Sequence, residues 1–430
     1  MSPADHRPPT TDHSLIRAVG FWGLVAMCIN AVIGSGVFLL PYESYKLLGP
    51  FSLWAPLLFA IPVFILVLCF AEAASHFTEP GGAYLYARTA FGDFIGFETG
   101  WMNWLARLTS LASLSNGFVL ALAIFNPAFK EPLPRAAVIV STVVILAAIH
   151  LLGIRYGAAS IYIFTWGKLL PLIGFIIVAL VLWKHNPIPG SFALPGARTN
   201  WSDAALFMLF AYAGFENLGV PAGEYKNPRK DLPFALLTGI VAIAIIYALA
   251  QLGAMSALPD LSSSDTPIAT AAANLIGPLG AMIVTIGALL SMAGTNSGTM
   301  LEGSRMLYAL SLDRRMGPVS YVHPQFHTPT VAITIHAVCA LALALYGSFG
   351  QLALLSATAR LATYLFTSAS LPFLRKTHDA RWVWTIIIGA LGLLVSLAFV
   401  YNLNAQKLRV AAIALTIGAV IYLVTRPRVH

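Results

Sequence analysis

Charged residues are scarce in this sequence of 430 residues: Asp, Glu, Lys and Arg make up 10%, whereas 58% of the residues are hydrophobic. An ordinary soluble domain carries about 25% charged residues. The deficit excludes a soluble enzyme, a nucleic-acid-binding protein and a disordered protein, because each of these needs far more polar or charged residues. The formal net charge of +8 comes from basic residues scattered through short loops, which form no nucleic-acid patch. What remains is a protein that crosses the lipid bilayer many times.

Cysteine is also rare. Cys28, Cys69 and Cys339 all lie inside apolar runs, so a disulfide framework is not expected. Residues 1–17 are largely polar and include Pro8 and Pro9, which predicts a disordered tail. No cleavable signal peptide is recognised before the first apolar run, so that run is expected to stay in the membrane.

Long apolar runs, in contrast, are abundant. A helix needs about 20 such residues to cross the hydrocarbon core of a bilayer. The sequence predicts about twelve spans, at 18–40, 51–74, 94–125, 136–152, 160–183, 203–222, 234–256, 275–310, 330–347, 351–373, 383–401 and 408–425. The runs lack the alternation of a membrane β-barrel, so the predicted fold class is an all-α integral membrane protein.

Lysine and arginine in the loops predict the orientation. If the N-terminus is cytoplasmic, the inner segments hold fifteen of these residues and the outer loops hold seven. The remaining three, Arg107, Lys168 and Arg360, lie inside spans. Because basic residues collect on the cytoplasmic side, we expect both termini in the cytoplasm and the protein in the cell membrane.

Two spans are interrupted by small residues. The first carries Gly34-Ser35-Gly36, and the sixth carries Ala213-Gly214 followed by Phe215-Glu216. The breaks are five spans apart, so the two broken helices cross the bilayer in opposite directions. This predicts an inverted repeat, with residues 18–183 as the first half, 202–374 as the second and 383–430 as two extra helices and a short tail. Glycine that serves helix packing is the alternative for each break alone.

The breaks also predict a ligand. Unpaired backbone groups inside a membrane must face a polar ligand or a water-filled cavity. A half-helix that starts near Ser35 directs free N–H groups and a positive dipole end at the gap, which suits a carboxylate. Half-helices that end near Val32-Ile33 and Phe210-Ala211 offer free carbonyls, which suit an ammonium. A zwitterionic α-amino acid fits both sets.

Several segments resemble the amino acid–polyamine–organocation (APC) transporters. They are residues 33–38 (IGSGVF), 79–86 (EPGGAYLY), 210–216 (FAYAGFE), 224–233 (EYKNPRKDLP) and 303–310 (GSRMLYAL). Their order and spacing cover roughly residues 18 to 375. The resemblance implies the sodium-symporter-like fold, with two inverted five-helix repeats plus two extra helices. It also implies amino-acid transport by alternating access.

The resemblance assigns roles to residues at the breaks. The substrate carboxylate is expected at the backbone of Ser35 and Gly36, and Gly34 is expected among the substrate-binding residues. The ammonium is expected at the carbonyls of Val32, Ile33, Phe210, Ala211 and Ala213. Phe210, Tyr212 and Phe215 are candidates for aromatic gating, with plain core packing as the alternative.

Lys168 lies deep in the fifth predicted span. Several sodium-independent members of the family carry a lysine at this point, where it replaces a sodium ion and contacts the unwound first helix. The resemblance therefore implies either a cation surrogate that gains and loses a proton or a fixed structural ammonium.

Glu216 directly follows the second break, where related transporters place a carboxylate for gating or coupling. A static partner for a nearby cation is the alternative.

Arg107 needs a carboxylate partner, because its guanidinium is always charged. Either Glu216 or the substrate is expected to supply it, and we favour Glu216, which predicts a neutral substrate. Arg360 is expected to be structural. Glu72, Glu98 and Glu302 are expected near cytoplasmic ends of spans, in loop ion pairs with Arg88 or Arg305.

The sequence therefore predicts a sodium-independent secondary transporter of α-amino acids, coupled to protons or acting as an exchanger. An exchanger without net proton coupling and a non-transporting sensor stay open as alternatives. No phosphate-binding loop is present, and no constellation for a membrane enzyme is evident. No cofactor is expected. No metal site is expected either, because Pro324 interrupts the spacing of His323 and His327.

Overall fold

The computed structural model describes residues 19–77, 81–153, 158–183, 192, 200–219, 225–258, 260–314, 316–374 and 381–425. The predicted tail 1–17 lies outside these residues, as do Glu79, Pro80 and Glu224 of the family-like segments. Within the described ranges the chain is helical, apart from turns and a single bridge between Val19 and Tyr225. The all-α fold class is thus confirmed.

The helices follow one another along the described ranges. The α-helices are α1 (Phe21–Val32), α2 (Gly36–Leu48), α3 (Ala55–Ser75), α4 (Ala83–Phe91), α5 (Asp93–Leu122), α6 (Pro132–Leu151), α7 (Ala158–Val181), α8 (Trp201–Tyr212), α9 (Pro228–Ala257), α10 (Pro267–Ile276), α11 (Pro278–Asp313), α12 (Thr330–Tyr346), α13 (Phe349–Leu374), α14 (Trp382–Tyr401) and α15 (Ala405–Val424). The 3-10 helices are η1 (Gly49–Leu53), η2 (Pro127–Lys130), η3 (Phe215–Asn217), η5 (Leu261–Ser263) and η6 (Gly317–Ser320).

Every one of the twelve predicted ranges overlaps one of these helices. Among the described residues, eight helices are long and apolar enough to span a membrane, namely α3, α5, α6, α7, α9, α11, α14 and α15. The bent pair of α1 and α2 makes a ninth span if it is counted as one. The other three predicted spans are not among these helices. Two of them are too short, since α8 has 12 residues and α12 has 17, and α13 has 26 residues but no stretch that is apolar enough.

The first span bends by 44° between α1 and the segment that starts at Gly36. Ile33 is extended, with φ −73° and ψ 93°, and the helix resumes at Gly36. The second break lies where α8 ends, at Ala213-Gly214. Gly214 has φ +129°, and a Cβ there would lie 2.4 Å from the carbonyl oxygen of Ala31. Glycine is therefore required both for the turn and for the close approach to α1.

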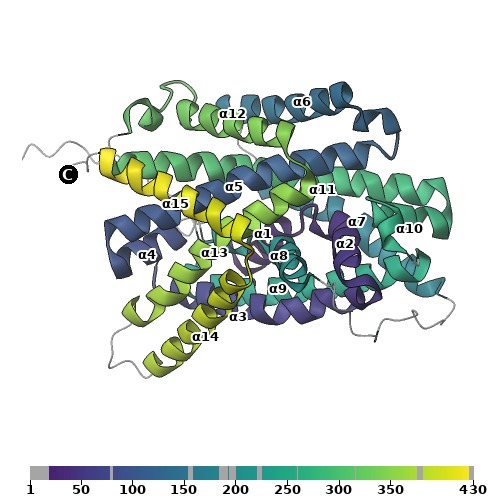
Figure 1. Ribbon diagram of the computed structural model, residues 1–430, viewed down its shortest axis with the longest axis horizontal. Helices are drawn as coiled ribbons and strands as arrows, with labels where there is room; N and C mark the ends of the chain where they lie inside the picture. Colours follow the sequence, from purple (N-terminus) through teal and green to yellow (C-terminus); the bar gives the residue numbers. More distant parts are fainter. Residues whose placement is uncertain are drawn as a thin grey trace, which may run out of the picture.

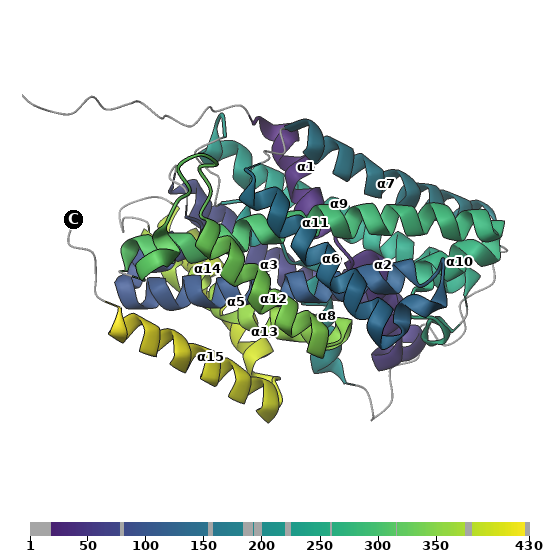
Figure 2. The same cartoon turned by 90° about the horizontal axis from the view of Figure 1, so that it is seen from above.

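The long helices surround the two broken ones. Figure 1 shows α6 and α12 side by side along one edge, next to the packed pair α5 and α11. Along the opposite edge lies α3, which packs against α9 and α14, and α1, α8 and α9 lie between the two edges. Figure 2 shows α15 at the periphery. Of the eight spans, α5 is the most buried and α15 the least, so α5 is placed to line a central site.

Candidate functional site

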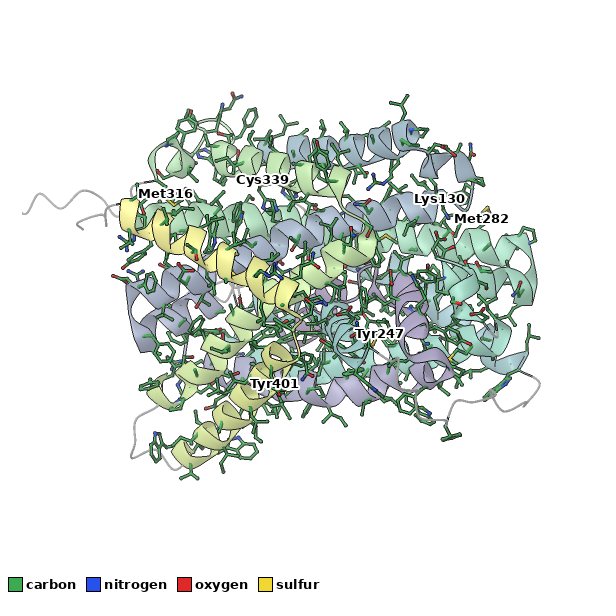
Figure 3. All side chains as sticks on the ribbon, viewed as in Figure 1. Lys130, Tyr247, Met282, Met316, Cys339 and Tyr401 are labelled. Atoms are coloured by element: carbon green, nitrogen blue, oxygen red, sulfur yellow. The ribbon has the colours of Figure 1, made fainter. Side chains whose placement is uncertain are left out.

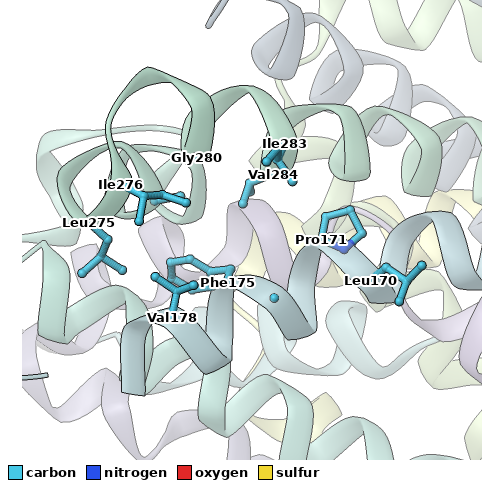
Figure 4. A pocket seen from close by; sticks show the side chains of 11 residues that line it. Leu170, Pro171, Phe175, Val178, Leu275, Ile276, Gly280, Ile283 and Val284 are labelled. Carbon is cyan, nitrogen blue, oxygen red and sulfur yellow. The ribbon is translucent and has the colours of Figure 1, made fainter. Parts of the chain in front are cut away.

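Two pockets differ sharply in chemistry. The larger one, of about 360 Å³, lies between α7, α10 and α11 and is lined by apolar and glycine residues (Figure 4). Its rim includes Leu170, Ile276 and Ile283, which are exposed, so it opens on an apolar outer surface. It offers no polar group for a zwitterion. The smaller one, of about 30 Å³, lies at the two helix breaks.

The smaller pocket, called the central cavity below, contains most of the predicted binding residues. Its lining includes Val32, Gly34, Ser35, Gly36, Phe210, Ala211, Ala213 and Arg107. Ile33 does not line it. The Ile33 carbonyl oxygen accepts hydrogen bonds from Lys168 Nζ at 2.6 Å and Ser291 Oγ at 3.0 Å.

Six further residues complete the lining. They are Ala31, Ser110, Leu114, Thr295, Thr299 and Arg360. Sequence reasoning did not assign these six residues to the site, although the spacing of some of them carries a signal. Arg107, Ser110 and Leu114 follow helical spacing on α5, and Thr295 and Thr299 are four residues apart on α11. Such spacings place side chains on one helix face.

The carboxylate end of the cavity is the start of α2. The first N–H groups of a helix have no partner within it and carry its positive dipole end. The Ser35 hydroxyl oxygen is buried and has no hydrogen-bond partner among the described residues. Backbone N–H groups and a free hydroxyl thus meet in the cavity, as an anionic group requires.

Tyr247 of α9 joins the two breaks at the carbonyl end. Its hydroxyl lies 2.9 Å from the Ala211 carbonyl oxygen and 3.4 Å from that of Val32. Tyr247 lies near the middle of the molecule in Figure 3. Sequence reasoning missed this residue, because α9 carries no break. The two half-helices are therefore held together by one side chain next to the expected ammonium position.

Lys168 is fully buried and reaches the unwound part of the first span. Its Nζ atom lies 2.6 Å from the Ile33 carbonyl oxygen, 3.1 Å from that of Asn30 and 3.4 Å from Thr295 Oγ1. An ammonium has three protons to donate, so these three acceptors match it. Ser291 Oγ supports the same segment, at 2.9 Å from the Gly34 carbonyl oxygen.

An ion network lies beside the cavity. Glu216 pairs with the guanidinium groups of both Arg107 and Arg360. It also accepts the Gly214 N–H at 2.8 Å and lies 3.4 Å from the Tyr364 hydroxyl. The network connects α5, η3 and α13, so it ties the second break to two neighbouring helices.

The structure bears on three expectations about charged residues. Arg360, expected to be structural, lines the cavity and also donates to Ser110 Oγ at 2.7 Å. The expected loop ion pair of Glu302 is wrong, because Glu302 lies 3.1 Å from Arg107 Nη1. The ion pair expected for Glu98 is wrong as well, since neither carboxylate oxygen has a partner among the described residues. Each of these contacts depends on the direction in which the side chain points from its helix, and hydropathy does not show this direction.

The three aromatic gating candidates lie in different places. Phe210 lines the cavity and contacts Phe349 edge to face, with ring centroids 6.3 Å apart. Tyr212 donates its hydroxyl to the Pro56 carbonyl at 2.8 Å, away from the cavity lining. Phe215 stacks on Tyr364 at 5.6 Å, next to the ion network. Only Phe210 is placed to touch a substrate in this conformation.

Known proteins resemble this chain over most of its length. The sequence model of a family described as amino acid permease matches residues 19–425. The serine/threonine exchanger SteT of Bacillus subtilis is 29% identical over 357 residues, which cover 81% of this chain and 81% of that protein. The branched-chain amino acid permease BcaP of the same organism is 27% identical over 436 residues, covering 96% of this chain and 93% of that protein.

Proposed function

Because the chain belongs to the amino acid permease family of the APC superfamily, we propose that it moves a neutral α-amino acid across the cell membrane by alternating access without sodium. Family membership makes the protein a multi-pass membrane transporter of amino acids rather than an enzyme. The neutral substrate, the mechanism and the coupling are the proposed parts.

The meeting of two helix breaks at one buried cavity carries the proposal. In this proposal the α2 end supplies N–H groups for the carboxylate, and the ammonium is bound by backbone carbonyls of Val32, Phe210, Ala211 and Ala213, four residues that line the cavity. The cavity of about 30 Å³ has room for about two water molecules. An amino acid therefore enters only when the half-helices move apart, as alternating access requires.

The charges around the cavity support a neutral side chain. Two guanidiniums, of Arg107 and Arg360, face two carboxylates, of Glu216 and Glu302. The protein itself balances this charge, so no second substrate carboxylate is needed. The names of the two Bacillus relatives also refer to neutral amino acids, serine and threonine for one and branched-chain residues for the other.

The position of Lys168 supports sodium independence. Its ammonium contacts the backbone of the unwound segment, and it repels a second cation at close range. The energy source is then a proton gradient or exchange of one amino acid for another. The description of one relative as an exchanger favours the second possibility.

Competition uptake tests the substrate, and counterflow tests the coupling. We expect L-serine, L-threonine and the branched-chain amino acids to compete for uptake into proteoliposomes more strongly than L-aspartate or L-glutamate. Stimulation by internal amino acid indicates exchange, whereas stimulation by an imposed pH gradient in its absence indicates proton symport. Preferred uptake of L-aspartate or L-glutamate would contradict a neutral substrate.

A further inference from the structure

Arg107 has two functions in this geometry. It lines the central cavity, and its two terminal nitrogens pair with different carboxylates, Nη2 with Glu216 and Nη1 with Glu302. Its Nε atom is buried without a hydrogen-bond partner among the described residues. A group that enters the cavity therefore competes with the two glutamates for one guanidinium.

The two carboxylates hold Arg107 very differently. The Glu216 side chain is 0% exposed and also pairs with Arg360 and accepts from Gly214 and Tyr364. The Glu302 side chain is 28% exposed, and its ion pair among the described residues is with Arg107 Nη1 at 3.1 Å. A proton reaches Glu302 more readily than the fully buried Glu216, and its arrival there breaks the ion pair with Arg107.

Apart from His336, whose ring nitrogens have no hydrogen-bond partner among the described residues, the other charged and titratable groups near Glu302 have partners of their own. Arg360 and Tyr364 on α13 bind Glu216. On α12 the His336 ring packs against Gly303, and on α6 His150 bonds to Ser297 at 3.2 Å. Lys168 on α7 is fully buried on its three acceptors. Arg305 lies on α11 itself. Of this set, only Arg107 contacts Glu302.

We propose that Glu302 is the residue at which proton binding is coupled to substrate binding, through its competition with the substrate for Arg107. A proton that binds Glu302 Oε2 neutralises the carboxylate and releases Arg107 Nη1. The freed guanidinium then stabilises the substrate carboxylate at the α2 end of the same cavity. This inference rests on the proposed function and names the residue through which a proton gradient would act.

Thermodynamic linkage determines whether substrate affinity rises or falls with pH. Protonation of Glu302 strengthens binding of the substrate carboxylate, so bound substrate must strengthen binding of the proton by the same factor. Substrate affinity is therefore high in acid and falls as the pH rises. Lys168 is less suited to this exchange, because its side chain is wholly buried.

The test compares substrate binding to purified wild type, Glu302→Gln and Glu98→Gln, with L-serine and L-isoleucine as probes. For wild type we expect a dissociation constant that rises by about tenfold between about pH 5 and about pH 8. Glu302→Gln should keep the low, acid value throughout, because glutamine is always neutral. Glu98→Gln is the matched control, a buried carboxylate without a partner among the described residues, and should follow wild type.

A measurement on the unmodified protein keeps the inference falsifiable if Glu302→Gln does not fold. When L-serine or L-isoleucine is added to wild type in weak buffer, the protein should take up protons. Absence of this uptake, or a wild-type pH response in Glu302→Gln, would overturn the role of Glu302. Failure of wild type to bind either amino acid at any pH would instead contradict the proposed substrates, so the two failures are distinguishable.

Discussion

Gly36 is the residue at which the half-helix α2 meets α8. A Cβ at Gly36 would lie 3.0 Å from Ala211 Cα and 3.1 Å from Ala211 Cβ. Glycine thus lets the half-helices approach while leaving the N–H groups of α2 open to the cavity. We expect Gly36→Leu to insert in the membrane but to bind neither L-serine nor L-isoleucine, because its side chain occupies the place of the substrate carboxylate.

Gly174→Leu is the matched control for this variant. A Cβ at Gly174 meets nothing within 4 Å, and the residue lies in the apolar pocket of α7 rather than in the central cavity. We expect it to bind like wild type in a scintillation proximity assay on purified protein. Wild-type affinity in Gly36→Leu would show that the α2 end is not the carboxylate site.

At the scale of residues, the sequence predicts the backbone part of the site and misses the side-chain part. Gly34-Ser35-Gly36 and Gly214 interrupt apolar runs, so they are visible without knowledge of the fold. Ser110, Thr295 and Tyr247 lie in uninterrupted helices, where a polar residue reaches the cavity only because of how that helix is rotated and packed. The roles predicted for the lining residues stay predictions until binding is measured.

At the scale of elements, α9 connects the ends of the two broken spans. The Tyr247 hydroxyl contacts the ends of both α1 and α8. We expect Tyr247→Phe to lower the free energy of unfolding by about 1 kcal/mol and to weaken amino-acid binding several-fold, since both carbonyls lose a donor. Tyr401→Phe is the control, because Tyr401 is 89% exposed at the end of α14. Equal thermal stability and equal affinity in the two variants would contradict this function of α9.

Element boundaries are where hydropathy is least informative. The apolar run 203–222 continues past the second break, whereas in the structure α8 ends at Tyr212 and η3 follows. The short helices α4 and α10 were not among the predicted spans, because a window of about 20 residues detects membrane-crossing length and not helicity. Hydropathy therefore predicts the number and order of the long segments, and local backbone geometry decides where each one stops.

At the scale of the whole molecule, the packing agrees with the family's architecture. The chain places α1, α2 and α8 at the centre and surrounds them with the longer helices, in keeping with two broken spans that share one cavity (Figure 1). The inverted repeat of residues 18–183 and 202–374 and the cytoplasmic position of both termini remain predictions. They rest on the five-span separation of the two breaks and on the lysine and arginine bias of the loops.

The central claim is that an amino acid crosses at the joined helix breaks while Lys168, rather than sodium, holds the unwound segment. The most direct measurement is the initial rate of L-serine and L-isoleucine uptake into proteoliposomes in sodium and in choline chloride, for wild type, Lys168→Ala and Lys168→Arg. We expect equal wild-type rates in the two salts. Lys168→Ala should lose uptake, because three acceptors lose the lysine ammonium. Lys168→Arg should transport poorly, because the larger guanidinium group does not fit that space. Wild-type uptake that stops without sodium, or a full rate in Lys168→Ala, would contradict the account.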